Sequence, residues 1–378
     1  MILTDWKTAF MPTTLITGGA GFIGRYVAEE LLAAGHNVRI LDSLIDQVHG
    51  GHEPALPEGA VLVRGDICDK DAVAEALEGC DGVVHLAAEV GVGQSMYEIA
   101  RYVGTNDLGT AVLLEAIAQH PVKRIVVASS MSVYGEGLYR AADGSLREKV
   151  RRSPAAIRAA DWQPKDAQGT PLEPIATTED KRVDLASIYA LTKYQQEQAV
   201  LIFGEAYDIP AVALRLWNVY GAGQALSNPY TGVLANFASR IANDQRPTIF
   251  EDGEQKRDFV HVRDVAAAFR LAMESDRAAG SVINIGSGHV YTVTQVATLL
   301  TEAMGRPDLT PEILNKARTG DIRNNFPDIS RARDLLGYAP QHRLEDSLGP
   351  FVAWVAGQAH TDKGDEMRRQ LEARGLVS

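Results

Sequence analysis

The chain of 378 residues is long enough for one large α/β domain or a domain with a smaller lobe, and its 46% hydrophobic and 23% charged residues are ordinary for a globular protein. The formal net charge of −12 argues against nucleic acid as the main partner, because phosphate binding needs a basic surface. No apolar run approaches the ~18–20 residues that span a membrane, so we expect no membrane partner.

The N-terminal ten residues lack the basic-then-apolar pattern of a signal peptide, and Met11 is an alternative start to Met1. The two cysteines, Cys68 and Cys80, fit no metal-binding or disulfide pattern. We therefore expect reduced structural thiols, no metal site and a cytoplasmic location.

The first element in chain order is a short apolar strand, 13–17, which runs into the glycine-rich turn 18–24 (GGAGFIG) and then into a helix from Arg25 to about Ala34. This context indicates dinucleotide binding, because glycines let the backbone approach a pyrophosphate and a helix N-terminus offers free N–H groups. A plain tight turn is the alternative. The predicted cofactor-binding residues of this turn are Gly18, Gly21, Phe22, Ile23 and Gly24.

The second strand, 38–41, ends at Asp42. An acid at this place accepts hydrogen bonds from the adenosine ribose and repels a 2′-phosphate, so it favours NAD over NADP. The third strand, 61–63, is followed by Asp66 and Ile67, although Asp66 could instead cap the next helix. The fourth strand, 83–88, ends in small residues that let the backbone pass close to a cofactor.

A helix is predicted from about Thr105 to Gln119, followed by a fifth strand over 124–128. Strands and helices that alternate at this spacing predict an α/β fold with a doubly wound parallel (Rossmann) sheet. Ligands of such sheets bind beyond the carboxyl ends of the strands. The hydroxyls of 129–135 (SSMSVYG) are therefore expected to face the cofactor.

No regular helix or strand pattern is predicted between Glu136 and Asp184, where prolines, glycines and mixed charges are scattered. A long insertion of this kind is usually functional or mobile. It ends just before a helix that carries Tyr189 and Lys193. Because residues i and i+4 share a helix face, the lysine ammonium can lower the tyrosine pKa, and the tyrosine can then take a proton from a sugar hydroxyl. An ordinary surface pair is the alternative.

A further strand, 211–216, completes an expected NAD-binding domain over 12–216, which includes the insertion 136–184. Residues 217–356 are predicted to form mainly a smaller C-terminal α/β lobe that binds the substrate. Part of this region, about 255–290, is expected to return to the main sheet, and 357–378 forms a charged tail.

These motifs together resemble the extended short-chain dehydrogenases/reductases that act on nucleotide sugars, over about residues 12–356. The motifs are the glycine turn, Asp42, Asp66, the HLAA run 85–88, Ser130, Tyr189 with Lys193, and the RDFVHV run 257–262. Within this family the chain resembles the dTDP-L-rhamnose 4-epimerase-like proteins. That similarity rests on 90–98 (VGVGQSMYE), 227–232 (SNPYTG), 320–323 (GDIR) and the insertion.

The resemblance implies NAD as the cofactor, a nucleotide-diphosphate sugar as the substrate, and 4-epimerisation through a transient 4-keto sugar. Many relatives with the insertion carry a Cys-x-x-Cys-like knuckle before a Pro-Leu-Glu-Pro segment, but 164–174 has no cysteine, so no metal-stabilised loop is expected. The resemblance also implies a homodimer formed through the helices near 105–119 and 187–204.

The resemblance assigns roles to individual residues. The implied catalytic residues are Ser130, Tyr189 and Lys193. The implied cofactor contacts outside the glycine turn are Asp42, Asp66, Ile67, Leu86, Ala87, Ala88, Asn106, Tyr189 and Lys193. The implied substrate contacts are Ser130, Ser132, Asn218, Arg257, Arg318 and Asp321, with Arg323 a weaker candidate.

Other functions within the family remain open to different degrees. A 4,6-dehydratase needs Asp-Glu after the catalytic hydroxyl residue, whereas this chain has Met131 and Ser132 there. A 4-ketoreductase would use NADPH, which Asp42 disfavours. A UDP-hexose or UDP-uronate 4-epimerase stays possible. A non-catalytic NAD-binding sensor would not need the complete Ser130, Tyr189 and Lys193 set.

Overall fold

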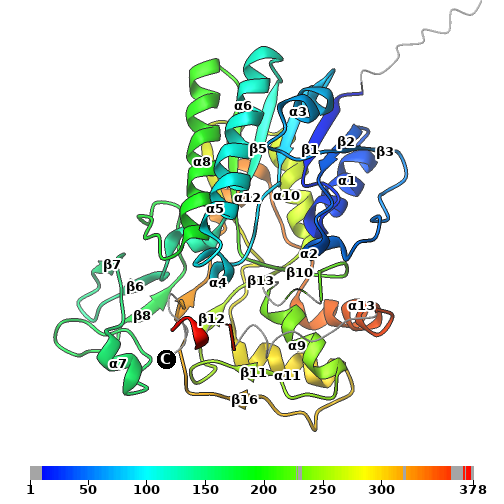
Figure 1. Ribbon diagram of the computed structural model, residues 1–378. Helices are drawn as coiled ribbons and strands as arrows, with labels where there is room; N and C mark the ends of the chain where they lie inside the picture. Colours follow the sequence, from blue (N-terminus) through cyan, green and yellow to red (C-terminus); the bar gives the residue numbers. More distant parts are fainter. Residues whose placement is uncertain are drawn as a thin grey trace, which may run out of the picture.

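The computed structural model describes residues 11–226, 228, 232–317, 321–358, 369–370 and 372–375. A central parallel sheet has helices on both faces, and a smaller lobe lies beyond one end of its strands (Figure 1). No helix in the described ranges is long and apolar enough to cross a membrane.

The central sheet has seven strands in the order β14-β9-β5-β4-β1-β2-β3, and all neighbouring pairs are parallel. Consecutive residues of each strand face opposite sides, and both sides are buried, as expected for a parallel sheet. The predicted doubly wound sheet is confirmed. The strands are β1 (Thr13–Thr17), β2 (Asn37–Asp42), β3 (Ala60–Arg64), β4 (Gly82–His85), β5 (Arg124–Ser130), β9 (Ala211–Leu216) and β14 (Ser281–Ile285).

Two apolar clusters fill the space between the sheet and its helices. One cluster packs the sheet against α1 (Phe22–Ala33), α10 (Val262–Glu274) and α12 (Ser330–Leu336). The other packs it against α3 (Lys70–Leu77), α6 (Gly109–Gln119) and α8 (Ile188–Tyr207). Neighbours such as Leu15 and Ile16 belong to different clusters, so β1 places apolar side chains on both faces of the sheet.

The helix predicted to begin at about Thr105 begins earlier. Helical backbone runs from α5 (Ile99–Tyr102) through a π-helical turn (Val103–Leu108) into α6. The π turn makes i→i+5 hydrogen bonds, for which helix propensity gives no signal, and such turns are frequent at functional sites. Short helices α2 (Asp46–His49) and α4 (Val92–Ser95) and 3₁₀ turns at Met131–Tyr134 and Asp276–Ala278 complete this part of the chain.

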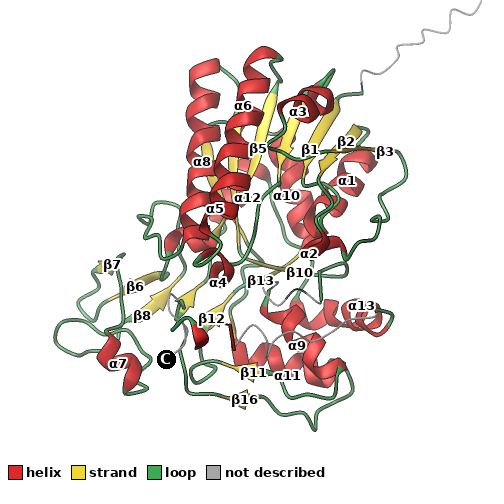
Figure 2. Cartoon of the chain, in the orientation of Figure 1, coloured by secondary structure: helices red, strands yellow, loops and turns green. Residues whose placement is uncertain are grey.

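The smaller lobe packs α9 (Val233–Ala242), α11 (Val293–Ala303) and α13 (Leu344–Ala356) around a third apolar cluster (Figure 2). Short strand pairs connect these helices. They are β10 (Asn218–Tyr220) with β13 (Phe259–His261), β11 (Thr248–Ile249) with β16 (Glu312–Ile313), and β12 (Lys256–Arg257) between β15 (Tyr291–Thr292) and β17 (Asn324–Asn325).

The insertion has a small fold of its own. Strands β6 (Leu138–Arg140), β7 (Leu146–Arg147) and β8 (Glu173–Ile175) form an antiparallel sheet with β6 in the middle, and α7 (Pro154–Arg158) lies between β7 and β8 in the chain. Tyr139, Ala141, Val150 and Leu172 form its separate apolar cluster. The insertion therefore has a small apolar core.

Candidate active site

A cavity of about 410 Å³ lies at the carboxyl ends of the central strands, where a doubly wound sheet binds its ligands. Most of the residues predicted for the cofactor or for catalysis line this cavity. They are Gly18, Gly21, Phe22, Ile23, Gly24, Asp42, Asp66, Ile67, Leu86, Ala87, Ala88, Ser130, Tyr189 and Lys193. The structure thus gathers residues that are up to 175 positions apart, from Gly18 to Lys193 (193 − 18), around one space.

The glycine turn has the shape that a dinucleotide pyrophosphate requires. Gly18 has φ +68°, and a Cβ there would lie 2.8 Å from the Ala87 nitrogen. A Cβ on Gly24 would lie 2.5 Å from the Gly19 Cα, so helix α1 can approach the turn this closely only with glycine at position 24. No side chain caps α1 at Gly21, which leaves its first N–H groups available to an anion.

Asp42 and Asp66 make different contacts in the wall of the cavity. The Asp42 carboxylate accepts the Ala20 N–H at 3.0 Å and the Leu44 N–H at 2.9 Å, and the His49 ring lies 3.6 Å from it. Asp66 does not cap the next helix, because Asp69 caps α3. The Asp66 side chain instead bonds the Cys68 N–H and faces the cavity.

We expect Asp42→Asn to raise the affinity for NADP relative to NAD by about tenfold, because it removes the negative charge that repels a 2′-phosphate. Competitive binding of the two cofactors to nucleotide-stripped protein measures the ratio. Asp46→Asn is the matched control, since Asp46 is exposed on neighbouring α2. An unchanged ratio for Asp42→Asn would contradict the role of this carboxylate.

Ser130, Ser132 and Tyr189 form a directed chain of hydroxyl groups. The Ser130 Oγ accepts the Ser132 N–H at 3.2 Å and the Ser132 hydroxyl at 2.9 Å. Because both acceptor positions are used, the Ser130 proton is left to donate to the Tyr189 oxygen, and this hydrogen bond lowers the Tyr189 pKa. Ser132 does not line the cavity. Its hydrogen bonds orient Ser130, and its predicted contact with the substrate stays a prediction.

The expected effect of Lys193 on Tyr189 is not present in the protein alone. Burial raises the pKa of Tyr189, and the Ser130 hydrogen bond opposes this only in part. The Lys193 ammonium donates to the Gln196 Oε1 at 2.7 Å rather than to the tyrosine. Burial also lowers the pKa of Lys193 to about 7, against the nearby Glu197 carboxylate, which raises it.

Gln196 connects Lys193 to the wall of the cavity. Its amide donates to the Ala87 carbonyl at 3.2 Å and to the Thr110 hydroxyl at 2.9 Å, and it lies 3.1 Å from the His85 Nε2. Burial lowers the pKa of His85 to about 3, so this ring is neutral and serves as a hydrogen-bonding core residue. The chain of contacts fixes the lysine before any ligand enters.

The start of α8 is fixed by residues of the segment that follows β4. The Tyr189 N–H donates to the Ser95 Oγ at 3.0 Å, and Asn106 donates to the Thr192 Oγ1 at 2.9 Å. Asn106 also accepts the Glu89 N–H at 2.7 Å. Asn106 is fully buried outside the cavity lining, where it supports the backbone around the site; its predicted contact with the cofactor stays a prediction.

A buried ion pair lies behind the catalytic residues. Glu197, one turn after Lys193, binds Arg215 of β9 through two hydrogen bonds of 2.8 and 2.6 Å. The Ser129 hydroxyl donates to the same carboxylate at 2.6 Å. Glu197 is 0% and Arg215 4% exposed. The pair therefore ties α8, β5 and β9 together directly beside Ser130.

Three of the predicted substrate residues, Asn218, Arg257 and Asp321, lie outside the lining of the cofactor cavity, on the lobe. The Asn218 amide donates to the Asp258 carbonyl at 2.7 Å, and Arg257 donates to the Lys256 and Arg323 carbonyls, both at 2.9 Å. Arg318 lies outside the described residues. Arg323, the weaker candidate, is bound to Asp252 by two hydrogen bonds of 2.5 and 2.9 Å, which makes it a structural group.

Sequence reasoning gave no role to Ser95, Gln196 or Glu89. Ser95 lies in a run used only for the family resemblance, and Gln196 follows Lys193 by one helical turn, a spacing that could have pointed to it. Glu89 lines the cavity and pairs with Arg101 at 2.7 Å. An acid just after β4 could have been noted, but its partner Arg101 lies on the separate helix α5.

The fold is doubly wound, and its cavity is lined by the glycine turn and by Ser130, Tyr189 and Lys193. These features define a dinucleotide-dependent enzyme of the extended short-chain dehydrogenase/reductase type. The family model of the NAD dependent epimerase/dehydratase family matches residues 14–286, and the chain belongs to this family. The predicted family is confirmed.

Among curated relatives, the chain is 36% identical over 349 residues to a dTDP-L-rhamnose 4-epimerase of Burkholderia thailandensis, covering 90% of this chain and 94% of the relative. It is 30% identical over 367 residues to a UDP-glucose 4-epimerase of Corynebacterium glutamicum, covering 92% and 98%.

Among solved structures, it is similar to a UDP-glucose 4-epimerase of Thermotoga maritima in complex with UDP-glucose, with a TM-score of 0.74, 31% identity and coverage of 91% and 99%. It is also similar to a UDP-glucuronic acid 4-epimerase of Bacillus cereus in complex with UDP-glucuronic acid and NAD, with a TM-score of 0.75, 27% identity and the same coverage.

Proposed function

We propose that the chain is an NAD-dependent nucleotide-sugar 4-epimerase that acts on a dTDP-6-deoxyhexose such as dTDP-L-rhamnose. The observation that carries the proposal is the convergence of Ser130, Tyr189 and Lys193 on the cavity that the glycine turn closes. The choice of sugar rests on the similarity to the Burkholderia thailandensis epimerase. A UDP-hexose or UDP-uronate substrate is the second candidate, because several similar epimerases are named for such sugars.

The protein groups divide the acid–base work. The Tyr189 oxygen takes the proton of the sugar 4-hydroxyl, and the Ser130 hydroxyl donates to the oxygen that becomes a carbonyl. Lys193 supplies positive charge beside the tyrosine and a donor for the nicotinamide ribose. NAD⁺, when bound, supplies the hydride acceptor and then donor for sugar C4, together with a positive charge that favours the phenolate. Tyr189 returns its proton when the carbonyl is reduced.

The geometry of the site and the sequence both disfavour dehydration. Elimination across C5 and C6 needs an acid and a base beside the catalytic hydroxyl. Met131 has no ionisable group, and the Ser132 hydroxyl is committed to the Ser130 oxygen at 2.9 Å. We therefore infer that oxidation and reduction occur at one carbon.

The lobe is proposed to hold the nucleotide diphosphate. Arg257 is the main candidate, because a guanidinium can make paired hydrogen bonds to phosphate oxygens. It makes three hydrogen bonds to carbonyls of described residues, and an arginine has five N–H donors. Asn218 lies on β10, which pairs with β13, and the same role is proposed for Arg318, with Asp321 nearby.

A homodimer is also proposed. Exposed apolar side chains gather on α5, the π turn and α8, which lie next to each other (Figure 1). These residues are Ile99, Val103, Leu108, Leu191 and Ile202. Light scattering of the purified protein measures the mass directly.

Incubation with dTDP-, UDP- and GDP-sugars without added cofactor tests the function. We expect inversion of the sugar at C4 in the NMR spectrum and release of NAD(H) from the denatured protein. Protein free of nicotinamide, or activity only with added NADPH, would favour a ketoreductase. Inversion of UDP-sugars alone would favour the second candidate.

A further inference from the structure

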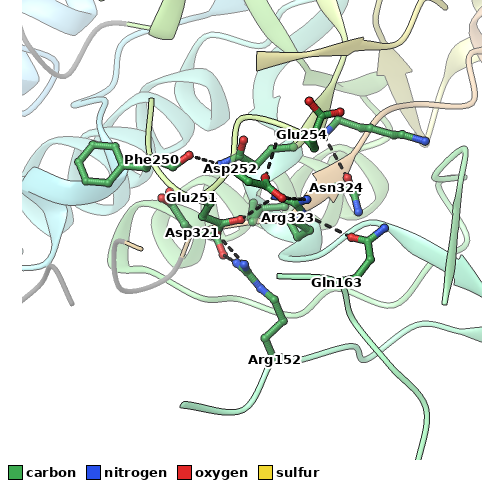
Figure 3. A network of polar contacts seen from close by, with 12 residues as sticks. Arg152, Gln163, Phe250, Glu251, Asp252, Glu254, Asp321, Arg323 and Asn324 are labelled. Carbon is green, nitrogen blue, oxygen red and sulfur yellow. Dashed lines mark hydrogen bonds and ion pairs between the residues drawn. The ribbon is translucent and has the colours of Figure 1, made fainter. Parts of the chain in front are cut away.

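A buried ionic network joins the insertion to the lobe (Figure 3). Arg152, in the insertion, bonds the Glu251 carboxylate at 2.6 Å and the Asp321 carbonyl at 2.9 Å. The Arg152 side chain is 5% exposed and that of Glu251 is 0% exposed. Ion pairs removed this far from water require close geometry, so they fix the relative position of the two segments.

Glu251 bridges Arg152 to a second arginine. Its other oxygen lies 3.1 Å from Arg323, which also bonds Asp252 and, at 3.3 Å, the Gln163 side chain of the insertion. Glu251 has φ +56°, a region that residues other than glycine seldom occupy. The backbone is thus held in an unfavourable conformation that presents the carboxylate to both arginines.

The insertion also holds the lobe through its first residue. The Glu136 carboxylate accepts the Arg323 N–H at 2.7 Å and the Asn324 N–H at 3.1 Å. The Tyr139 hydroxyl donates to Glu136 at 2.9 Å and accepts from the Asn324 side chain at 3.2 Å. Segment 321–324 is therefore bound from the insertion side by both backbone and side-chain contacts.

The same segment also contacts Arg257. The Arg257 guanidinium donates to the Arg323 carbonyl at 2.9 Å and to the Ile322 carbonyl. Burial lowers the pKa of Arg257, and the carboxylates of Asp321, Glu136 and Glu251 oppose this effect, in that order. The position of the guanidinium therefore depends on a segment that the insertion holds in place.

We propose that the insertion is a fixed support for the substrate-binding arginine, and that Arg152, acting through Glu251 and segment 321–324, is a positioning residue for nucleotide-diphosphate binding. The proposal rests on the proposed function of Arg257. It assigns the insertion a role in substrate affinity through contacts with the lobe. It requires no movement of the insertion over the sugar.

The test is Arg152→Met in the full chain, which keeps an unbranched apolar side chain and removes the guanidinium with its charge. We expect KM for the nucleotide sugar, and the Kd of dTDP, to rise about tenfold or more, with kcat within about twofold and the bound NAD unchanged. Arg140→Met is the matched control, because Arg140 makes an exposed pair with Glu173 on the same small sheet. The control should leave KM and Kd unchanged.

Three outcomes distinguish a failure of the support role of the insertion from a failure of the proposed diphosphate site. If Arg257→Met weakens dTDP binding but Arg152→Met does not, the support role is wrong and the diphosphate site stands. If Arg257→Met leaves dTDP binding unchanged, the diphosphate site itself is wrong. A fall in kcat with unchanged KM in Arg152→Met would also overturn the proposal.

Glu251→Gln carries the same test if Arg152→Met fails to fold. It keeps the size and the acceptor oxygen and removes the shared negative charge. An increase in KM and dTDP Kd with unchanged NAD content supports the proposal, whereas unchanged values contradict it.

Discussion

Tyr189→Phe is expected to lower kcat by about 10³-fold while the protein keeps its bound NAD. The substitution removes only the hydroxyl oxygen that takes the sugar proton and that the Ser130 hydroxyl bonds. Single-turnover kinetics on the purified protein measure the loss, and release of NAD(H) on denaturation measures the cofactor.

Tyr194→Phe is the matched control, because Tyr194 is a partly buried tyrosine on the same helix that packs in an apolar cluster. It should retain the kcat of the unmodified protein. Retention of activity by Tyr189→Phe would remove the acid–base role from this residue. Loss of NAD together with activity would instead indicate a binding role.

Arg215→Met is expected to lower the free energy of unfolding by about 3–5 kcal/mol, because it leaves the fully buried Glu197 carboxylate without its cation. This is a large share of the ~5–15 kcal/mol of a typical domain. Urea unfolding at pH 7 measures the change. The Arg215 side chain also lies over the Tyr134 ring, 4.6 Å from its centre, so packing is lost as well.

Arg140→Met is again the control, since an exposed ion pair contributes only about 0–1 kcal/mol to the free energy of unfolding. Arg215→Met together with Glu197→Leu should recover part of the loss, because no charge then remains buried. A loss for Arg215→Met no larger than that of Arg140→Met would contradict the importance of the buried pair.

The sheet and the cofactor cavity were predictable because their signals are local. When a short apolar run is followed directly by glycines, or by Asp42, these few residues indicate both that a strand forms and where it ends. Parallel strands then bring these ends to one edge of the sheet. The same logic placed Ser130 at the carboxyl end of the fifth strand, where the structure has it.

The other features of the site and of the insertion depend on contacts between residues that are far apart in the sequence. Arg152 and Glu251 are 99 positions apart, and neither stands in a pattern that names its partner. The orientation of Ser130 by Ser132 and the attachment of Lys193 to Gln196 follow from side-chain directions at the cavity. The pKa of Tyr189 depends on burial, which the spacing of a Tyr-x-x-x-Lys motif does not reveal.

The central claim is that one carbon of the sugar is oxidised and reduced within a single active site. The most direct measurement follows a nucleotide sugar carrying deuterium at C4, incubated with the protein without added cofactor. We predict a C4 epimer that keeps its deuterium at C4. Deuterium found at C6 would indicate dehydration, and loss of deuterium from the inverted sugar would show that the hydrogen does not return to the carbon it left.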